Sequence, residues 1–571
     1  MTASNAAERA RYETEREYMA TFLAILGDVG ALNNNPFMIA QDSLHLGTSS
    51  VAQASDAIAG LAGLLWFVDE SASKALDDAL RLLKATWFSL ILWIDFLRPG
   101  QGHFKPDRAQ VQAILHLLLR ISYWKGQLSD LLFQTAGVYT WTMWLWLHAS
   151  DIYDLPKAGA NASEDYLDWH STLSLATEQF ILDYRQGEHP TLDPVPAQHA
   201  FGAVKHKYRR LLTLVIGGVL HVPRLATSPG TKPWTPDALR TVVDRVGVLG
   251  AIVVAADLNM GVKAQDMKVL VHLIRTLQLT PGGKEAACCV CDLIFWICNA
   301  ATDHKPLLWS LQCGVFPLLI SLAEIDHGVG EGAIDHSVVP LLQHIASRTV
   351  LYPIAQAFEQ YRHGSSFSML RIKGADDWAS ADDIIALRRQ IMERPHPARC
   401  SNESCSTTPS AEVTFRRCPC YNAYYCSVSC QRQDRSRHKL MCAIRKGADG
   451  RYHSSAALNC SPDDSFLTPK VVHFIQEITS HYVEQHMEDI LATVRQQIPA
   501  GPKLADHIQI HVDFDNQVAP THSLYVVPRV MEDGPRHDYL RDDEIEVRVF
   551  AELGDHRKAG FVLAKVYAFA R

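Results

Sequence analysis

The stretch that decides the local fold runs from Cys400 to Cys442 and reads CSNESCSTTPSAEVTFRRCPCYNAYYCSVSCQRQDRSRHKLMC. It holds seven of the 13 cysteines of the chain. Cysteine and histidine fall there in four closely spaced pairs, which are Cys400/Cys405, Cys418/Cys420, Cys426/Cys430 and His438/Cys442. Zinc is usually held by four such ligands that arrive in pairs, because a short turn can aim two side chains at one ion. Four pairs therefore predict two tetrahedral zinc sites.

The order of these pairs is similar to a known family. The order Cys-x4-Cys, Cys-x-Cys, Tyr-Tyr-Cys-x3-Cys, Gln-x2-Asp and His-x3-Cys resembles the MYND zinc finger, with Tyr424, Tyr425, Gln431 and Asp434 as further matching positions. This resemblance implies interleaved ligation, with Cys400, Cys405, Cys426 and Cys430 on the first zinc and Cys418, Cys420, His438 and Cys442 on the second. Both zinc ions are expected to be structural, since eight ligands leave no open coordination position.

The resemblance also implies a role in protein interaction. Several MYND fingers bind proline-rich peptides through a Gln and a Trp near the final helix. Gln431 matches that Gln, whereas Arg435 stands where the Trp is expected, which removes a flat wall for a proline ring. The basic set around it predicts a solvated surface, a surface for an acidic protein partner or, less readily, a nucleic-acid surface: Arg416, Arg417, Arg432, Arg435, Arg437, Lys439, Arg445 and Lys446.

The composition favours a globular protein. Hydrophobic residues make up 47% of the 571 residues and charged residues 20%, with a net charge of −8. This balance gives no general attraction to nucleic acid or to anionic membranes. The longest apolar runs, residues 85–97 and 137–149, are shorter than the roughly 20 residues of a membrane span, so we expect buried helices. The amino terminus resembles neither a secretory signal nor a transit peptide, which predicts an intracellular protein without membrane contact.

The chain is expected to be mainly helical. Apolar residues recur at helical spacing between short Gly, Pro and Asp breaks, as in Met267, Leu270, Val271 and Ile274. This region is either an armadillo- or HEAT-like solenoid or an irregular helical bundle. The predicted organisation is a helical lead (1–40), a helical domain (41–395), the finger (396–446), a linker (447–468) and a small α+β domain (469–571). The last begins with a helix from Pro469 to Ile498, followed by four strands with alternating patterning.

The motifs do not indicate catalysis. The sequence shows no Gly-x-Ser-x-Gly elbow, Walker motif or His-Glu-x-x-His. A lysine methyltransferase of the SET class, in which a MYND finger interrupts the catalytic domain, would need an Asn-His-x-Cys stretch that is absent. The cysteines at 288, 289, 291 and 298 lie in an apolar helical run and are expected to be core thiols.

We therefore predict a zinc-binding scaffold or regulatory protein, with transcription co-regulation as one candidate role, that binds protein partners through the finger and the helical domain. The alternatives are the SET-like methyltransferase and a nucleic-acid-binding regulator. Beyond the finger, the layout resembles that of MYND-containing proteins of mushroom-forming fungi.

Overall fold

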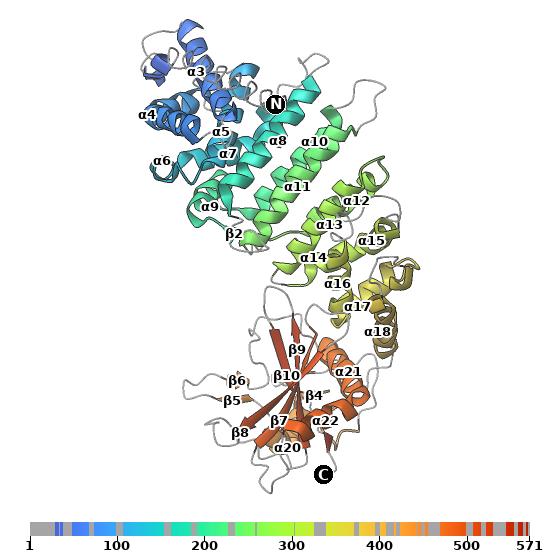
Figure 1. Cartoon of the computed structure of the whole chain (residues 1–571). Helices are drawn as coiled ribbons and strands as arrows, with labels where there is room; N and C mark the ends of the chain where they lie inside the picture. The colour runs from blue at the N-terminus through green and yellow to red at the C-terminus, as the bar shows by residue number, and fades with distance from the viewer. Residues whose placement is uncertain are drawn as a thin grey trace, which may run out of the picture. The chain divides into compact units, whose positions relative to one another are not determined.

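The protein is mainly α-helical in the computed structural model (Figure 1). The structure describes residues 29–33, 35–37, 48–67, 73–98, 107–152, 162–183, 191–225, 234–256, 260–301, 303–324, 338–369, 376–393, 400–406, 416–417, 423–441, 444–446, 452–454, 469–497, 506–514, 521–528, 544–552, 558–562 and 567–568. The chain divides into two compact units. The first holds residues 1–261 and 280–289, and the second holds residues 262–279 and 290–571.

The first unit consists of packed helices. Helix α5 packs against both α3 and α8, while α8 also contacts α7 and α11, and α11 contacts α10. The elements are η1 (Val29–Asn33), α3 (Thr48–Phe67), α4 (Ser73–Leu97), α5 (Arg108–Tyr123), α6 (Ser129–Gln134), α7 (Gly137–Ile152), α8 (Ala162–Ile181), β1 (Leu182–Asp183), β2 (Thr191–Leu192), α9 (Pro194–Phe201), η3 (Gly202–Val204), α10 (Tyr208–Leu225) and α11 (Pro236–Ala256).

Three tryptophans mark the core of this unit. Trp87, Trp93 and Trp146 are fully buried, and each indole N–H donates to a partner. The acceptors are Thr135 Oγ1 at 3.1 Å, Leu32 O at 3.2 Å and Ser174 Oγ at 3.0 Å. A buried indole N–H without an acceptor would cost free energy, so these bonds fix how the helices meet. The two apolar runs predicted to be buried helices are confirmed, since they lie in α4 and α7.

A buried arginine occupies the same core. Arg245 of α11 donates to Trp146 O at 3.1 Å and bonds the His170 imidazole. Burial lowers the pKa of His170 well below its usual value, and the neighbouring Arg245 charge lowers it further. His170 is therefore neutral and can accept from the guanidinium. Gly218 of α10 lies directly against that guanidinium, where a larger side chain has no room.

The second unit begins with further helices, and α13 (Lys284–Asn299) is divided between the two units. The helices before the finger are α12 (Ala264–Gln278), α14 (Lys305–Gln312), α15 (Val315–Glu324), α16 (Val339–Arg348), α17 (Tyr352–Tyr361), η4 (Phe367–Met369) and α18 (Asp376–Glu393). The predicted apolar face of α12 is confirmed, because Met267, Leu270, Val271 and Ile274 are all buried. The thiols of Cys288, Cys291 and Cys298 are also buried, as expected for core cysteines.

The finger and the carboxyl-terminal elements follow. They are β3 (Arg416–Arg417), β4 (Tyr424–Tyr425), α19 (Val428–Gln433), α20 (Arg435–Met441), β5 (Ile444–Lys446), β6 (Tyr452–Ser454), α21 (Pro469–Gln485), α22 (Met487–Gln497), β7 (Asp506–Asp513), β8 (Thr521–Pro528), β9 (Glu544–Glu552), β10 (Lys558–Val562) and β11 (Tyr567–Ala568). The sheet order is β10-β9-β7-β8, and β7 pairs with β9 in parallel while the other pairs are antiparallel.

The long helix predicted from Pro469 to Ile498 is two helices that meet at His486. The His486 imidazole stacks on Tyr482 with ring centroids 4.2 Å apart and bonds the Tyr482 carbonyl. Helix α21 returns to the helical region, because Phe474 packs edge-on against Tyr352 of α17 at 5.4 Å. The boundary at residue 469 and the separate α+β domain stay predictions, as does the choice between solenoid and bundle.

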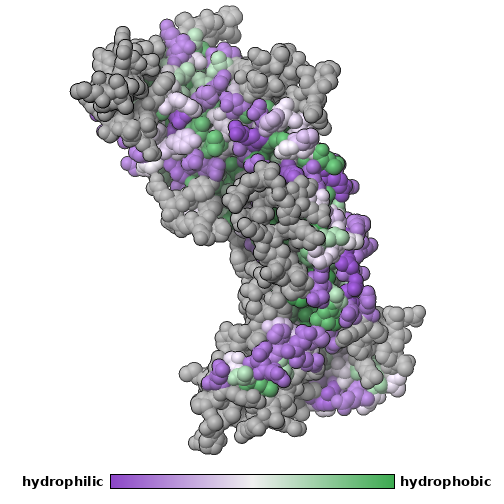
Figure 2. Space-filling model, turned by 45° about the vertical axis from the view of Figure 1, so that its right-hand side comes forward, coloured by the Kyte–Doolittle hydropathy of each residue, from purple (hydrophilic) through white to green (hydrophobic). Residues whose placement is uncertain are grey.

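Among the described helices, none is by itself long and apolar enough to cross a membrane. The pair α14 and α15 reaches the length and apolar composition of a membrane span only when the two helices are taken together, and a bend of 75° separates them. On the face drawn in Figure 2, the coloured hydrophilic residues are interspersed with hydrophobic ones.

Candidate metal centre

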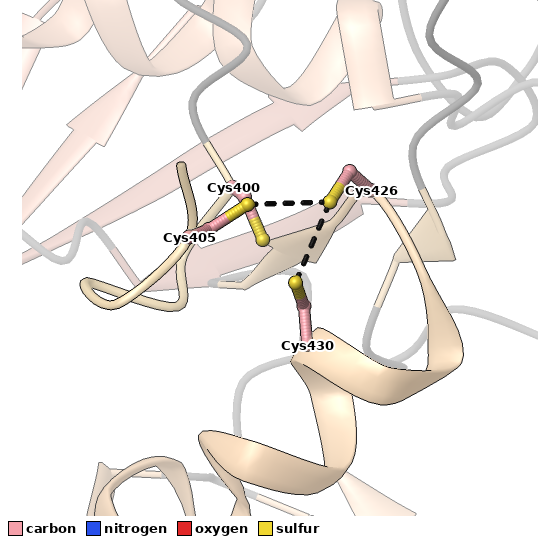
Figure 3. Close-up of side chains that lie close together, drawn as sticks. All are labelled: Cys400, Cys405, Cys426 and Cys430. Atoms are coloured by element: carbon pink, nitrogen blue, oxygen red, sulfur yellow. Dashed lines mark hydrogen bonds between the residues drawn. The ribbon is translucent and has the colours of Figure 1, made fainter. Parts of the chain in front are cut away.

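Four cysteines converge in the finger. Cys400 and Cys405 come from the loop at 400–406, Cys426 follows β4, and Cys430 lies on α19. Their sulfur atoms all lie within 4.8 Å of one another. The Cys426 sulfur is 3.4 Å from that of Cys405 and 3.5 Å from that of Cys430 (Figure 3). Two cysteine pairs that are distant in the sequence therefore direct their sulfur atoms toward one point.

Local hydrogen bonds hold both pairs in position. The Ser401 amide donates to Tyr424 O at 2.7 Å, and the Tyr424 amide donates to Ser401 Oγ at 2.8 Å. These bonds tie the loop at 400–406, which we call the first knuckle, to β4. The Cys405 amide closes the knuckle turn on Asn402 O at 2.9 Å. Ser427 caps α19, because its hydroxyl accepts from the Cys430 amide at 3.1 Å. A serine before a helix is a favoured cap, and here it also fixes the Cys430 backbone.

The quartet fits a zinc ion. Four sulfurs at about 2.3 Å from a tetrahedral zinc are about 3.8 Å apart, close to the separations seen here. Burial raises the pKa of the Cys400 thiol to about 12, so without a cation this thiol stays protonated. A bound zinc would reverse that preference, since it is the thiolate that ligates. With four cysteine ligands the first site would be closed to a catalytic water.

A polar network surrounds the quartet and centres on Asp434. Its carboxylate is 4% exposed and accepts from the Tyr425 hydroxyl at 2.9 Å and from Arg437 Nε at 2.7 Å. The Arg437 guanidinium also donates to Ser401 O. Although burial opposes ionisation, the bonds from Arg437 and Tyr425 hold the pKa of Asp434 below its usual range. The network joins the first knuckle, β4 and α20.

The ligands predicted for the second zinc are only partly described. His438 lies on α20, is buried, and packs edge-on against Tyr425 at 6.0 Å between ring centroids. It lies outside the sulfur quartet. Cys418, Cys420 and Cys442 fall outside the described residues.

The residues predicted for partner binding lie on the helical side of the finger. Gln431 on α19 is half-buried, and Arg435 at the start of α20 is exposed. Arg416, Arg432 and Lys439 are exposed as well, whereas Arg437 is engaged with Asp434. Side chains of the other predicted basic residues, Arg417, Arg445 and Lys446, are outside the described part.

Comparison with known proteins agrees with this geometry. Residues 399–442 match the family model of the MYND finger. No curated protein and no solved structure matches the chain. The chain thus contains a MYND zinc finger, and a MYND finger with a cysteine cluster implies zinc binding and a zinc-dependent interaction or regulatory role. The likeness of the whole layout to fungal MYND-containing proteins gains no support from these comparisons.

Sequence reasoning missed one part of the site, the role of Arg437. It placed Arg437 in a general basic surface, whereas the structure commits it to the buried Asp434. The available signal was the i, i+3 spacing of Asp434 and Arg437, which puts the two side chains on one helix face.

Proposed function

We propose that the chain is a scaffold or regulatory protein whose finger, held together by two structural zinc ions, binds a protein partner. The observation that supports this proposal is the convergence of the four cysteine sulfur atoms within 4.8 Å of one another. Cys400, Cys405, Cys426 and Cys430 would hold the first ion, and the second would be held by Cys418, Cys420, His438 and Cys442. Each ion would tie segments distant in sequence, so its binding energy supplies folding energy to a region too short to bury a large core.

We further propose that the finger prefers an acidic peptide to a proline-rich one. Arg435 and Arg432 are exposed on α20 and α19, beside the half-buried Gln431. Guanidinium groups bind carboxylates through paired hydrogen bonds. A proline ring instead packs against a flat aromatic side chain, and the family's Trp position holds Arg435. Partner binding would then be weakened by salt, because exposed charges are screened.

The experiment that tests this function is a binding assay on the full chain with fluorescent acidic, proline-rich and basic peptides of equal length. The acidic peptides are expected to bind the wild-type chain. The double variant Arg432→Glu and Arg435→Glu should lose that binding. The control variant Lys84→Glu, which reverses an exposed charge on α4, should keep it.

Two results would refute the acidic preference. One is binding of the proline-rich peptides that persists in the double variant, and the other is equal loss in the Lys84→Glu control. Failure of every peptide to bind both wild type and control would instead count against the finger as a peptide-binding surface. Native mass spectrometry of the same samples shows whether the finger carried its metal in each case.

A further inference from the structure

An exposed aromatic cluster lies in the first unit, where the end of α3 meets the last turn of α5 (Figure 1). The Arg120 guanidinium carbon is 3.5 Å from the ring centroid of Trp66 and 5.6 Å from that of Tyr123. Trp66 is 62% exposed and Tyr123 is 47% exposed. Tryptophan, tyrosine and arginine are the residue types that contribute most to binding at protein interfaces. The cluster therefore indicates an interaction surface on the helical region.

The charge of Arg120 has no counter-charge in the described part of the chain. Among the residues that the structure describes, Arg120 forms no ion pair, and its Nε atom is buried without a hydrogen-bond acceptor. Its guanidinium instead stacks on the Trp66 ring. A carboxylate supplied by a partner would make charge-assisted hydrogen bonds to this guanidinium, which are stronger than bonds between neutral groups.

Trp66 ends a row of residues that runs along the side of α3 opposite its buried side. Steps of four and three residues separate the members of this row, and such steps form the line of contact when two helices pack at about 20°. A Cβ on Gly63 would meet nothing within 4 Å, so the space beside it is open. Four members are exposed and Gly63 is half-buried; we call the row the outer face of α3, and it consists of Ala52, Asp56, Ala59, Gly63 and Trp66.

The outer face of α3 carries little charge. Asp56 is the only charged residue among the 20 residues of α3. An exposed helix of a globular protein usually has charged residues on its solvent side, and a helix that is apolar on nearly every side is usually buried. The composition of α3 is therefore that of a helix with partners on both sides, although its outer face is exposed in the single chain.

We propose that the outer face of α3 binds the same face of a second copy of this chain, with the two α3 helices antiparallel. Residue 61 is the midpoint both of 56 and 66 and of 59 and 63. One twofold axis beside residue 61 therefore brings two contacts into register. Ala59 of each copy lies opposite Gly63 of the other, which lets the helices approach closely. Asp56 of each copy lies opposite the stacked Trp66 and Arg120 of the other.

A second copy fits this surface better than a partner helix of a single charge. The surface has the negative Asp56 on one side of residue 61 and the positive Arg120, held on Trp66, on the other side. An acidic helix would attract Arg120 and repel Asp56, and a basic helix would do the reverse. Twofold pairing gives both groups a partner of opposite charge, because each copy supplies what the other needs.

The proposal is tested by two charge reversals in the full chain. The measurement is the molar mass by light scattering during size-exclusion chromatography, with samples loaded from about 1 to about 100 µM, a range that includes the Kd of a small interface. The wild-type mass is expected to rise toward that of a dimer. Asp56→Arg and Arg120→Glu should each stay monomeric, because each variant brings like charges together at both contacts.

A one-to-one mixture of these two variants should dimerise again. In the mixed dimer, Arg at position 56 of one copy meets Glu at position 120 of the other, and Asp56 meets Arg120 at the second contact. Restored dimers also show that both variants are folded. Ala59→Arg, at an exposed position, should be monomeric as well. The matched controls Lys84→Glu and Asp130→Arg reverse exposed charges on α4 and α6 and should each dimerise like wild type.

Several results would overturn the proposal. They are a wild-type chain that stays monomeric at the highest concentration, an Asp56→Arg, Arg120→Glu or Ala59→Arg variant that dimerises alone, and a mixture of the first two that stays monomeric. Loss of the dimer in either control, or a mass that keeps rising beyond a dimer, would also contradict twofold pairing through α3. None of these outcomes depends on peptide binding by the finger, so this test is independent of the proposed function.

Discussion

Asp434 and Arg437 form a two-pronged pair inside the finger, with Arg437 Nε 2.7 Å from Asp434 Oδ1 and a terminal guanidinium nitrogen 3.0 Å from Oδ2. The same carboxylate accepts from Tyr425, and the same guanidinium reaches the carbonyl of Ser401. Through this pair the final helix is fastened to β4 and to the knuckle that carries Cys400.

Asp434→Asn is therefore expected to loosen the finger. The substitution keeps the shape but removes the charge that Arg437 needs, at a cost of about 2 kcal/mol for a buried charged hydrogen-bond partner. The measurement is the rate of zinc loss to a chromogenic chelator, which should rise.

The matched control is Glu403→Gln, because Glu403 also pairs with Arg437, at 3.3 Å, but is 78% exposed. An exposed pair of this kind contributes at most about 1 kcal/mol, so the rate of zinc loss should barely change. Equal effects of the two substitutions would contradict a special role for the buried carboxylate.

The zinc content gives a second prediction. Native mass spectrometry of the wild-type chain should show two zinc ions, and Cys430→Ser should lose at least the one held by the quartet, because a serine hydroxyl is a poor zinc ligand. Cys289→Ser, which alters a half-buried thiol on α13, should keep both ions. A wild-type chain with one zinc would refute the two-site assignment, and a fully loaded Cys430→Ser variant would refute the quartet.

Two adjacent glycines on α10 give a third prediction. A Cβ on Gly218 would lie 2.8 Å from the Arg245 guanidinium carbon, whereas one on Gly217 would meet nothing within 4 Å. Arg245 is fully buried and bonded to Trp146 O, so it has little room to move. Gly218→Ala should lower the free energy of unfolding by about 1–3 kcal/mol through overpacking.

Gly217→Ala is the control for that change. It lies one residue away on the exposed side of the same helix, where alanine is better than glycine by about 1 kcal/mol. Thermal unfolding should thus shift in opposite directions for the two variants. A stabilised Gly218→Ala variant would show that Arg245 can move aside.

Asp292 on α13 gives a prediction about pH. Burial raises the pKa of its carboxyl group to about 7, against about 3.9 in an unfolded chain. The folded state therefore holds a proton that the unfolded state releases, and stability falls as pH rises from about 4 to 7. Asp292→Asn should remove this loss and stabilise the protein at pH 8 by about 2–4 kcal/mol.

The measurement is the thermal midpoint of wild type and variant between pH 5 and 8, a window set by the shifted pKa of Asp292. Their difference should grow with pH. The exposed Asp383→Asn on α18 serves as the control and should follow wild type across the range. A pH-independent difference between Asp292→Asn and wild type would show that the carboxyl group ionises normally.

Much of the helical region was predictable because helices are local structures. The apolar spacing of Met267, Leu270, Val271 and Ile274 predicts the buried face of α12, since these side chains share one side of a helix. The break at His486 was not predictable in the same way. The apolar pattern continues through it, and the stacking of the His486 ring on Tyr482 at the break is a contact that the pattern does not specify.

The type of the metal centre follows from the sequence, because the spacing of the cysteine pairs limits which residues can reach one ion. Which pairs meet depends on the tertiary structure, in which the bonds between Ser401 and Tyr424 of β4 help to hold Cys400 and Cys405 beside Cys426 and Cys430. The tertiary structure also decided that Arg437 belongs to the buried Asp434, while Arg432 and Arg435 are exposed. Burial separates these charges, and burial depends on residues distant in the chain, which no local pattern specifies.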